Sequence, residues 1–264
     1  MEHFIDALLN RKYNLRDEMD AIESLFRKKI DNYSAYEIFE KNFLDWGDRN
    51  NFVDIKTFYS KMGIFKILNQ YSRVDDIALE DFIYYCEFML NIINFSPVSK
   101  CKNSFYIMLN ISNILKKLNF EYRQTNKKFH IVEKNVLVSE AADIVKDNYD
   151  LGEGIYSFNY RENQGNITHK ADILCRLYKY IESIENKAKS YSYFELLEDI
   201  KALANKLDIR HAATAKQSDV INNMSKDEYE SLLDELFNLS LSLIILVDYK
   251  SKRKDIKALK AQLG

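Results

Sequence analysis

Glycine and proline are scarce in this sequence, with 6 glycines and a single proline, Pro97, among 264 residues. These two residues mark the turns and sheet edges of β-rich proteins. Their scarcity argues against an all-β fold and favours long helices with short polar connections. Three cysteines are present, Cys86, Cys101 and Cys175, which are far apart and have no histidine near them. We expect free thiols in a reducing compartment and no disulfide framework.

Several motifs that carry chemistry are missing. The sequence has no glycine-rich nucleotide-binding loop, no G-x-S-x-G nucleophile elbow and no H-E-x-x-H zinc motif. The four histidines, His3, His130, His169 and His211, are scattered along the chain. We therefore expect neither a cofactor nor a bound metal ion.

The charge balance and the hydrophobic runs exclude two further classes. The net charge is −2 and the sequence pI is about 6.2, so the chain as a whole has no nucleic-acid signature. The most apolar run, residues 236–247, is shorter than the ~20 residues that a membrane span needs. The first residues lack the basic-then-apolar pattern of a signal peptide. We expect a cytoplasmic protein with no membrane contact.

Apolar residues at helical spacing dominate the rest of the sequence. They make up 47% of the chain, and aromatic residues alone make up 13%. Ser34 and Ser225 stand where helix caps are expected, and Glu228 completes a capping box with Ser225. The pattern predicts helices over 14–30, 34–46, 55–70, 75–94, 102–118, 139–146, 170–189, 193–207 and 225–249. The predicted fold class is mainly α, built of helical bundles.

The hydrophobic period changes after residue 118. Apolar and polar residues alternate over 120–131 around Thr-Asn-Lys-Lys, which predicts a small β-hairpin. Residues 148–168 are polar and hold three of the six glycines, which is typical of a linker or an exposed loop. We predict an N-terminal helical region (1–118), a hairpin-containing connector (119–168) and a C-terminal helical bundle (169–264).

Arg210 and His211 form the pair best suited to chemistry. A guanidinium holds a phosphate with a fixed fork of donors, and an imidazole moves protons near neutral pH. Cleavage of RNA needs both functions, because a ribose hydroxyl must lose a proton beside a phosphate. The alternative is a packing role, in which Asp208 caps a helix and Arg210 pairs with a carboxylate.

The sequence around this pair resembles a known family. Leu-Asp-Ile-Arg-His-Ala over 207–212 precedes Lys-Asp-Glu-Tyr-Glu-Ser-Leu-Leu-Asp-Glu-Leu-Phe over 226–237, and the helix pattern of 170–182 comes before both. Across about 165–250 this resembles abortive-infection-like proteins with a HEPN-type helical domain. The resemblance implies a helical bundle, RNA as the target, a homodimer and a role in bacterial antiphage or toxin–antitoxin systems.

The sequence departs from that family at one position. Active HEPN ribonucleases carry a histidine after four to six residues that follow the arginine, and here Ala215, Lys216 and Gln217 stand at those places. Arg123 and His130 have the family spacing but fall in the predicted hairpin, where we do not expect that spacing to bring them together. A metal-independent endoribonuclease and a silent helical module that regulates a partner protein both stay open.

The C-terminal segment adds a second candidate site. Residues 250–260 hold six cations and one carboxylate. Such a run is either a solvated helix face or a surface that contacts phosphates, and each contact adds salt-dependent affinity without sequence choice. The candidate RNA-binding residues are Lys250, Lys252, Arg253, Lys254, Lys257 and Lys260.

Residues 236–247 bear on self-association. Leu236, Phe237, Leu239, Leu241 and Leu243 exceed what one apolar stripe needs, and four more apolar residues follow. A helix that is apolar on every side is either central to its own domain or shared with a second chain. The second reading predicts a homodimer.

Overall fold

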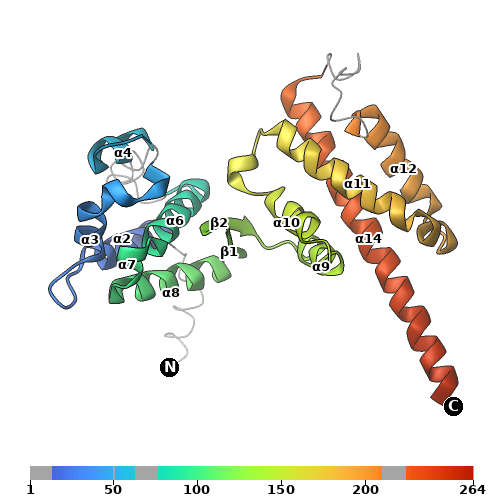
Figure 1. Cartoon of the computed structure of the whole chain (residues 1–264), viewed down its shortest axis with the longest axis horizontal. Coiled ribbons are helices and arrows are strands. Elements are labelled where there is room, and N and C mark those ends of the chain that lie inside the picture. Colours follow the sequence, from blue (N-terminus) through green and yellow to red (C-terminus); the bar gives the residue numbers. More distant parts are fainter. Residues whose placement is uncertain (1–13, 50, 63–76, 210–223, 264) are drawn as a thin grey trace. The chain divides into compact units, whose positions relative to one another are not determined.

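The computed structural model describes residues 14–49, 51–62, 77–209 and 224–263 (Figure 1). The fold is mainly α with one two-stranded antiparallel hairpin, so the predicted fold class is confirmed. The chain divides between Glu133 and Lys134 into two compact units. Each unit has its own hydrophobic core.

The first unit packs its described helices into one core, with the hairpin against two of them. Asn14 and Ser34 cap the first two helices of the described residues, and Ser34 forms a reciprocal capping box with Glu37, which confirms the predicted cap. Its described elements are α2 (Leu15–Arg27), α3 (Ala35–Lys41), η1 (Phe43–Asp45), η2 (Gly47–Arg49), α4 (Ile55–Lys61), α6 (Leu79–Asn94), α7 (Ser96–Ser99), α8 (Lys102–Lys117), β1 (Phe120–Thr125) and β2 (Lys128–Glu133). The predicted helix over 55–70 extends beyond the described residues after Met62.

Aromatic side chains fill much of the first core. The ring of Trp46 lies edge-on to Phe39 at 5.1 Å and to Phe58 at 5.3 Å between centroids. Tyr85 is buried, and its hydroxyl donates to Glu23 Oε2 at 2.8 Å. Burial raises the pKa of Tyr85 well above its usual value, so the hydroxyl stays a neutral donor. The aromatic richness of the sequence therefore serves packing in this unit.

The hairpin is fixed by its turn and by helix α6. Asn126 and Lys127 both have positive φ, the geometry of a two-residue turn that matches strand twist. The Asn91 side chain accepts from Phe129 N at 2.7 Å and donates to Phe129 O at 2.9 Å. Glu87 accepts from Ile131 N at 2.7 Å. Side chains of α6 thus take the place of a further strand beside β2.

The second unit is a bundle built around the last helix of the chain. Its described elements are α9 (Val136–Ile144), α10 (Tyr149–Ser157), η4 (Arg161–Asn163), α11 (Ile167–Ser190), α12 (Phe194–Lys206) and α14 (Lys226–Leu263). Helix α14 packs against α9, α11 and α12. The predicted helices over 139–146, 170–189 and 193–207 correspond to α9, α11 and α12.

The predicted loop over 148–168 is wrong, because nine of its residues form helix α10. Asn148 caps this helix by accepting from Leu151 N, and Leu151 and Ile155 are buried one turn apart. Gly152 and Gly154 are buried as well. Glycine lowers intrinsic helix propensity, but tertiary burial of the apolar residues outweighs it here.

The segment predicted as a connector, 119–168, does not form a unit of its own. Its hairpin belongs to the first core, which includes Phe129 and Ile131. Its helices α9 and α10 belong to the second core, which includes Val138 and Leu151. The change of hydrophobic period marks the hairpin but not a domain boundary.

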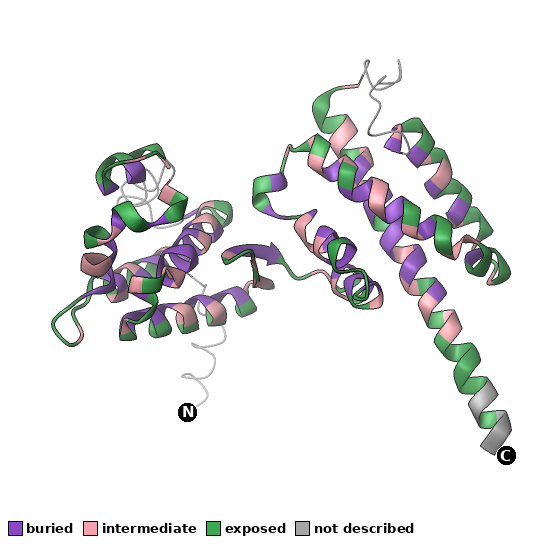
Figure 2. Ribbon diagram, in the orientation of Figure 1, coloured by how far each residue is buried: buried purple, intermediate pink, exposed green. Residues whose placement is uncertain are grey.

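Helix α14 buries one broad side where it lies at the centre of its unit. At roughly 100° per residue, the buried residues of the stretch 233–247 fall within an arc of about 160°, and burial ends after Val247 (Figure 2). Its buried residues are Leu233, Leu236, Phe237, Ser240, Leu241, Leu243, Ile244 and Val247. The packing within one chain therefore accounts for most of the apolar run, whereas Leu239 and Ile245 are half-buried and Leu246 is exposed.

Removing the Asn91 side chain is expected to destabilise the first unit. The variant Asn91→Ala leaves the buried N–H and C=O of Phe129 without these partners, at a cost of about 2–4 kcal/mol. Trp46 is the only tryptophan and lies in the first core, so its fluorescence during urea unfolding reports on this unit. In the control Asn94→Ala, water can replace the exposed hydrogen bond to Lys127 O. The free energy of unfolding should therefore fall by less than about 1 kcal/mol.

Candidate functional site

Arg210 and His211 lie outside the described residues, so their predicted role stays a prediction. The chain reaches them from the end of α12, where Leu207 and Ile209 are buried in the second core. Asp208 has a φ of 54° and its backbone N donates to Asn205 O, which ends the helix. The residues that immediately precede Arg210 therefore belong to the core of the second unit.

The start of α14 is held close to the end of α12. Ser225 and Glu228 form the predicted capping box: Ser225 Oγ accepts from Glu228 N at 3.2 Å, and Ser225 N donates to Glu228 Oε2 at 2.8 Å. The hydroxyl of Tyr229 donates to Leu207 O at 3.2 Å. The two helices that flank Arg210 and His211 in sequence are thus joined directly.

Lys170 forms a buried ion-pair cluster with the first turns of α14. Its side chain is 6% exposed, and its Nζ lies 2.8 Å from Glu230 Oε1 and 2.7 Å from Asp234 Oδ1. The ammonium also lies 5.0 Å from the centre of the Phe158 ring, which stacks on Phe237 at 3.9 Å. The two ion pairs and the aromatic ring offset the free-energy cost of removing this cation from water.

Glu230 joins this cluster to the loop before α11. The hydrogen bond from Lys170, followed by that from Gly165 N at 2.9 Å, lowers the pKa of Glu230. Gly165 has a φ of +69°, the left-handed region that favours glycine, and it turns the chain into α11. The cluster holds loop, α11 and α14 together. The polar atoms of this cluster bond to one another, so the cluster serves to position these elements.

Arg123 and His130 are brought together, contrary to the expectation from their spacing. They are directly opposite partners in the hairpin register, because the tight turn folds one strand back on the other. Arg123 pairs with Glu121 at 2.8 Å. His130 is buried, so this pair offers no open site for an RNA strand.

The C-terminal part of α14 carries the six predicted cations on a helix that has left its core. The sequence predicted a helix ending near Tyr249, but α14 continues to Leu263. Lys250 is half-buried, and the described side chains from Lys252 onward are exposed (Figure 2). Lys252 forms an ion pair with Asp248 at 2.8 Å.

Five of the six cations share one side of this helix. At roughly 100° per residue they fall within an arc of about 120°. We call this set the basic face; it consists of Lys250, Arg253, Lys254, Lys257 and Lys260. Lys252 lies on another side of the helix, where Asp248 partly neutralises it.

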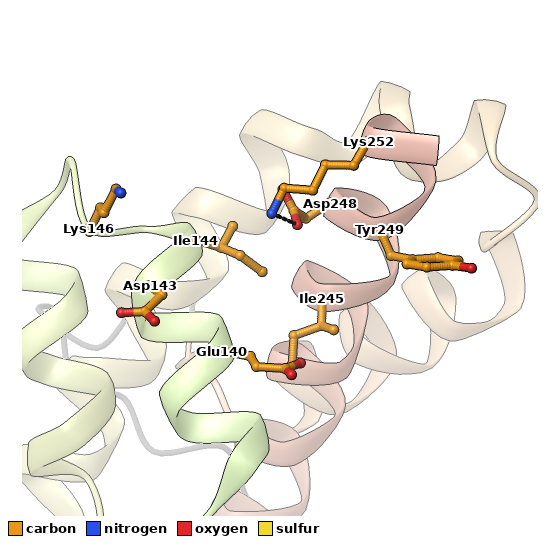
Figure 3. A pocket seen from close by; sticks show the side chains of 8 residues that line it. All are labelled: Glu140, Asp143, Ile144, Lys146, Ile245, Asp248, Tyr249 and Lys252. Carbon is orange, nitrogen blue, oxygen red and sulfur yellow. Dashed lines mark ion pairs between the residues drawn. The ribbon is translucent and has the colours of Figure 1, made fainter. Parts of the chain in front are cut away.

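A groove lies between α9 and α14, with a volume of about 450 Å³ (Figure 3). Ile144 of α9 and Ile245 of α14 project into the space between the helices, and the Tyr249 ring forms the outer edge, pointing away from α9. We call this the α9/α14 groove. Its charged lining residues are Glu140, Asp143, Lys146, Asp248 and Lys252. The groove therefore places apolar side chains next to carboxylates.

Within the described residues, no group of three or more His, Cys, Asp or Glu side chains is arranged to hold a metal ion. Cys86, Cys101 and Cys175 are free thiols. Burial raises the pKa of Cys86 far above that of a free thiol, which keeps it protonated and unsuited to nucleophilic attack. No helix in the described part of the chain is long and apolar enough to cross a membrane.

No protein-family model, no curated protein and no solved structure matches this chain.

Two features of the second unit were missed from the sequence. Lys170 continues the apolar stripe of Leu174, Leu177 and Ile181 at helical spacing, and a lysine in such a stripe signals a buried, paired cation. The α9/α14 groove left no comparable signal, because it depends on how two helices far apart in sequence pack.

Replacing Lys170 should loosen the second unit. The variant Lys170→Met leaves the Glu230 carboxylate without its buried partner, which we expect to cost about 2–4 kcal/mol. The destabilisation should appear as faster hydrogen–deuterium exchange of backbone amides in α11 and in residues 226–247. The matched control Lys252→Met removes an exposed ion pair, and exchange in these segments should stay as in the wild type. Unchanged exchange in Lys170→Met would show that the cluster does not stabilise the unit.

Proposed function

We propose that this protein binds RNA through the basic face of α14 and acts as an abortive-infection-type defence protein. The observation that carries the proposal is the exposure of this face on a helix that extends beyond its own core. Among the described residues, no ion pair joins Arg253, Lys254 or Lys257 to a carboxylate. Phosphates can bind these side chains without disrupting ion pairs within the protein.

The geometry of the basic face suits an extended polyanion. Lys250, Lys254 and Lys257 follow one another at spacings of four and three, and they span roughly 10 Å along the helix. The face carries no aromatic residue for base stacking, so affinity would come from charge. We infer binding with little sequence preference.

The chemical step belongs to Arg210 and His211 in this proposal. The resemblance to HEPN-type proteins supports a cleavage role, and the close joining of α12 and α14 would hold the ends of their segment in one place. Arg210 would neutralise the scissile phosphate while His211 takes the proton from the ribose 2′-hydroxyl. The 2′-oxygen then bonds to phosphorus as the P–O5′ bond breaks, and the leaving 5′-oxygen takes a proton from the His211 imidazolium or from water. No metal ion or cofactor enters this scheme.

A second candidate function is a silent interaction module that regulates a partner protein. The α9/α14 groove favours it, because apolar side chains lie beside three carboxylates on one surface. In this alternative the basic face is only a solvated helix end, and Arg210 and His211 have no reactive role.

The salt dependence of RNA binding tests the basic face. Binding of a labelled single-stranded oligouridylate should weaken with salt, and the log–log slope should become shallower by about 0.7 for each cation changed to Gln, roughly 3.5 for all five. The measurement is fluorescence anisotropy at several salt concentrations. Stability should hardly change, because four of the five side chains are exposed and Lys250 is only half-buried.

Lys252→Gln is the matched control, since this lysine is on the same helix but is already paired with Asp248. It should reduce the slope less than any single change on the basic face. Salt-dependent binding that survives the loss of all five charges would place the nucleic-acid surface elsewhere. No binding at low salt would favour the interaction module.

Cleavage is tested separately with the double variant Arg210→Ala, His211→Ala. If the wild type degrades purified cellular RNA, the double variant should lose at least a hundredfold in rate, because general acid–base catalysis alone contributes about 10²–10⁴-fold. Its anisotropy titration should still show RNA binding through the basic face. Equal cleavage by both proteins would refute the assignment of these two residues.

A further inference from the structure

Helix α8 exposes two neighbouring aromatic rings, whereas most aromatic side chains of the first unit pack in its core. Phe105 is 65% exposed and Tyr106 is 49% exposed. Their rings meet edge to face, with 5.7 Å between centroids and 72° between planes. Leu109, which is 47% exposed, lies one turn further along the helix. The helix therefore presents ring surface to solvent that the core does not use.

The two rings lie among lysines on one side of the helix. At roughly 100° per residue, the exposed residues of α8 fall within an arc of about 120° (Figure 2). Those that carry rings, charge or apolar bulk form what we call the α8 face, which consists of Lys102, Phe105, Tyr106, Leu109, Lys116 and Lys117. Cations thus stand at both ends of this face, and the aromatic and apolar residues lie between them.

The charge around the α8 face has one sign. Residues 88–120 contain four lysines and no carboxylate, although the chain as a whole has 40 acidic residues. Lys102 pairs with Asp31 at 2.7 Å, but both side chains are exposed, so the pair is weak and a phosphate can replace the carboxylate. Lys116 forms no ion pair within the described residues. This local excess of positive charge favours an anionic ligand.

We propose that the α8 face binds single-stranded nucleic acid, with unpaired bases stacked on Phe105 and Tyr106 and phosphates held by the lysines. Exposed rings among cations bind single strands in this way with little choice of sequence. A duplex keeps its bases stacked on one another, so this face selects single strands. The site lies outside the region that resembles HEPN-type proteins, and it goes beyond the proposed function of the basic face.

The spacing along α8 suits a strand laid along the helix. Lys102 precedes the rings by ~5 Å along the axis, which allows its flexible side chain to reach a phosphate beside a stacked base. Lys116 follows the rings by ~15 Å, where it meets a phosphate further along the strand. The α8 face thereby supplies the contact with bases that the basic face of α14 lacks.

The affinities for a labelled oligodeoxyadenylate and for an abasic strand of the same length test the proposal. DNA is the probe because stacking needs only the bases, and a strand without 2′-hydroxyls is not a substrate for the cleavage step proposed above. The wild type should bind the adenylate strand roughly 5- to 100-fold more tightly than the abasic strand. Fluorescence anisotropy at several salt concentrations measures both affinities.

Substitution of both rings separates base stacking from simple apolar contact. The double variant Phe105→Leu, Tyr106→Leu keeps apolar bulk but removes the rings, so its preference for the adenylate strand should disappear. The double variant Phe105→Trp, Tyr106→Trp should keep the preference, because indole rings also stack on bases. Neither pair of changes should alter the salt slope, since no charge is removed.

Leu109→Ala is the matched control on the same face. It removes apolar bulk but no ring, so the preference for the adenylate strand should stay as in the wild type. Circular dichroism should show the wild-type helix content in all these variants, because the three side chains are exposed. An α8 face that docks an apolar protein segment instead would tolerate the leucines and respond to Leu109→Ala.

Two results would overturn the proposal: equal affinity of the wild type for both strands, and a preference for the adenylate strand that survives the loss of both rings. The variant with all five cations of the basic face changed to Gln separates this site from the proposed function. It should keep the preference, and loss of the preference there would also contradict independent binding by α8. An unchanged salt slope together with a retained preference in that variant would refute the basic face and support the α8 face.

Discussion

Burial of the middle of α14 is the constraint on which the second unit depends. Residues on one broad side of the stretch 233–247 are withdrawn from water where α9, α11 and α12 pack against it. Apolar burial is the largest favourable term in folding, so this helix sets the positions of the others. Because a helix is stiff, it also sets the direction in which the residues after Val247 leave the core.

Polar interactions further fix the position of α14 relative to α11 and α12. The Lys170 cluster ties α11 to the first turns of α14, and Tyr229 ties α14 to the end of α12. A buried cation is tolerated only with its partners in place, so the cluster penalises arrangements in which α14 is shifted along its axis. The ends of the segment that carries Arg210 and His211 are positioned by these same contacts.

The two sides of the free part of α14 offer different chemistry. One side carries Tyr249 at the edge of the α9/α14 groove, and the other presents the basic face. The proposed RNA binding follows from this division, which separates most of the cations from the apolar residues around one helix.

The sequence by itself determined the helical class, the hairpin at its turn and the caps at Ser34 and Ser225, because these depend on local periodicity and short-range hydrogen bonds. Helix α10 was missed because its glycines weaken a local signal that burial of Leu151 and Ile155 restores. Only the tertiary structure decided that Lys170 is buried between Glu230 and Asp234 and that α9 and α14 form a groove. Each of these depends on packing between segments that the local pattern does not relate.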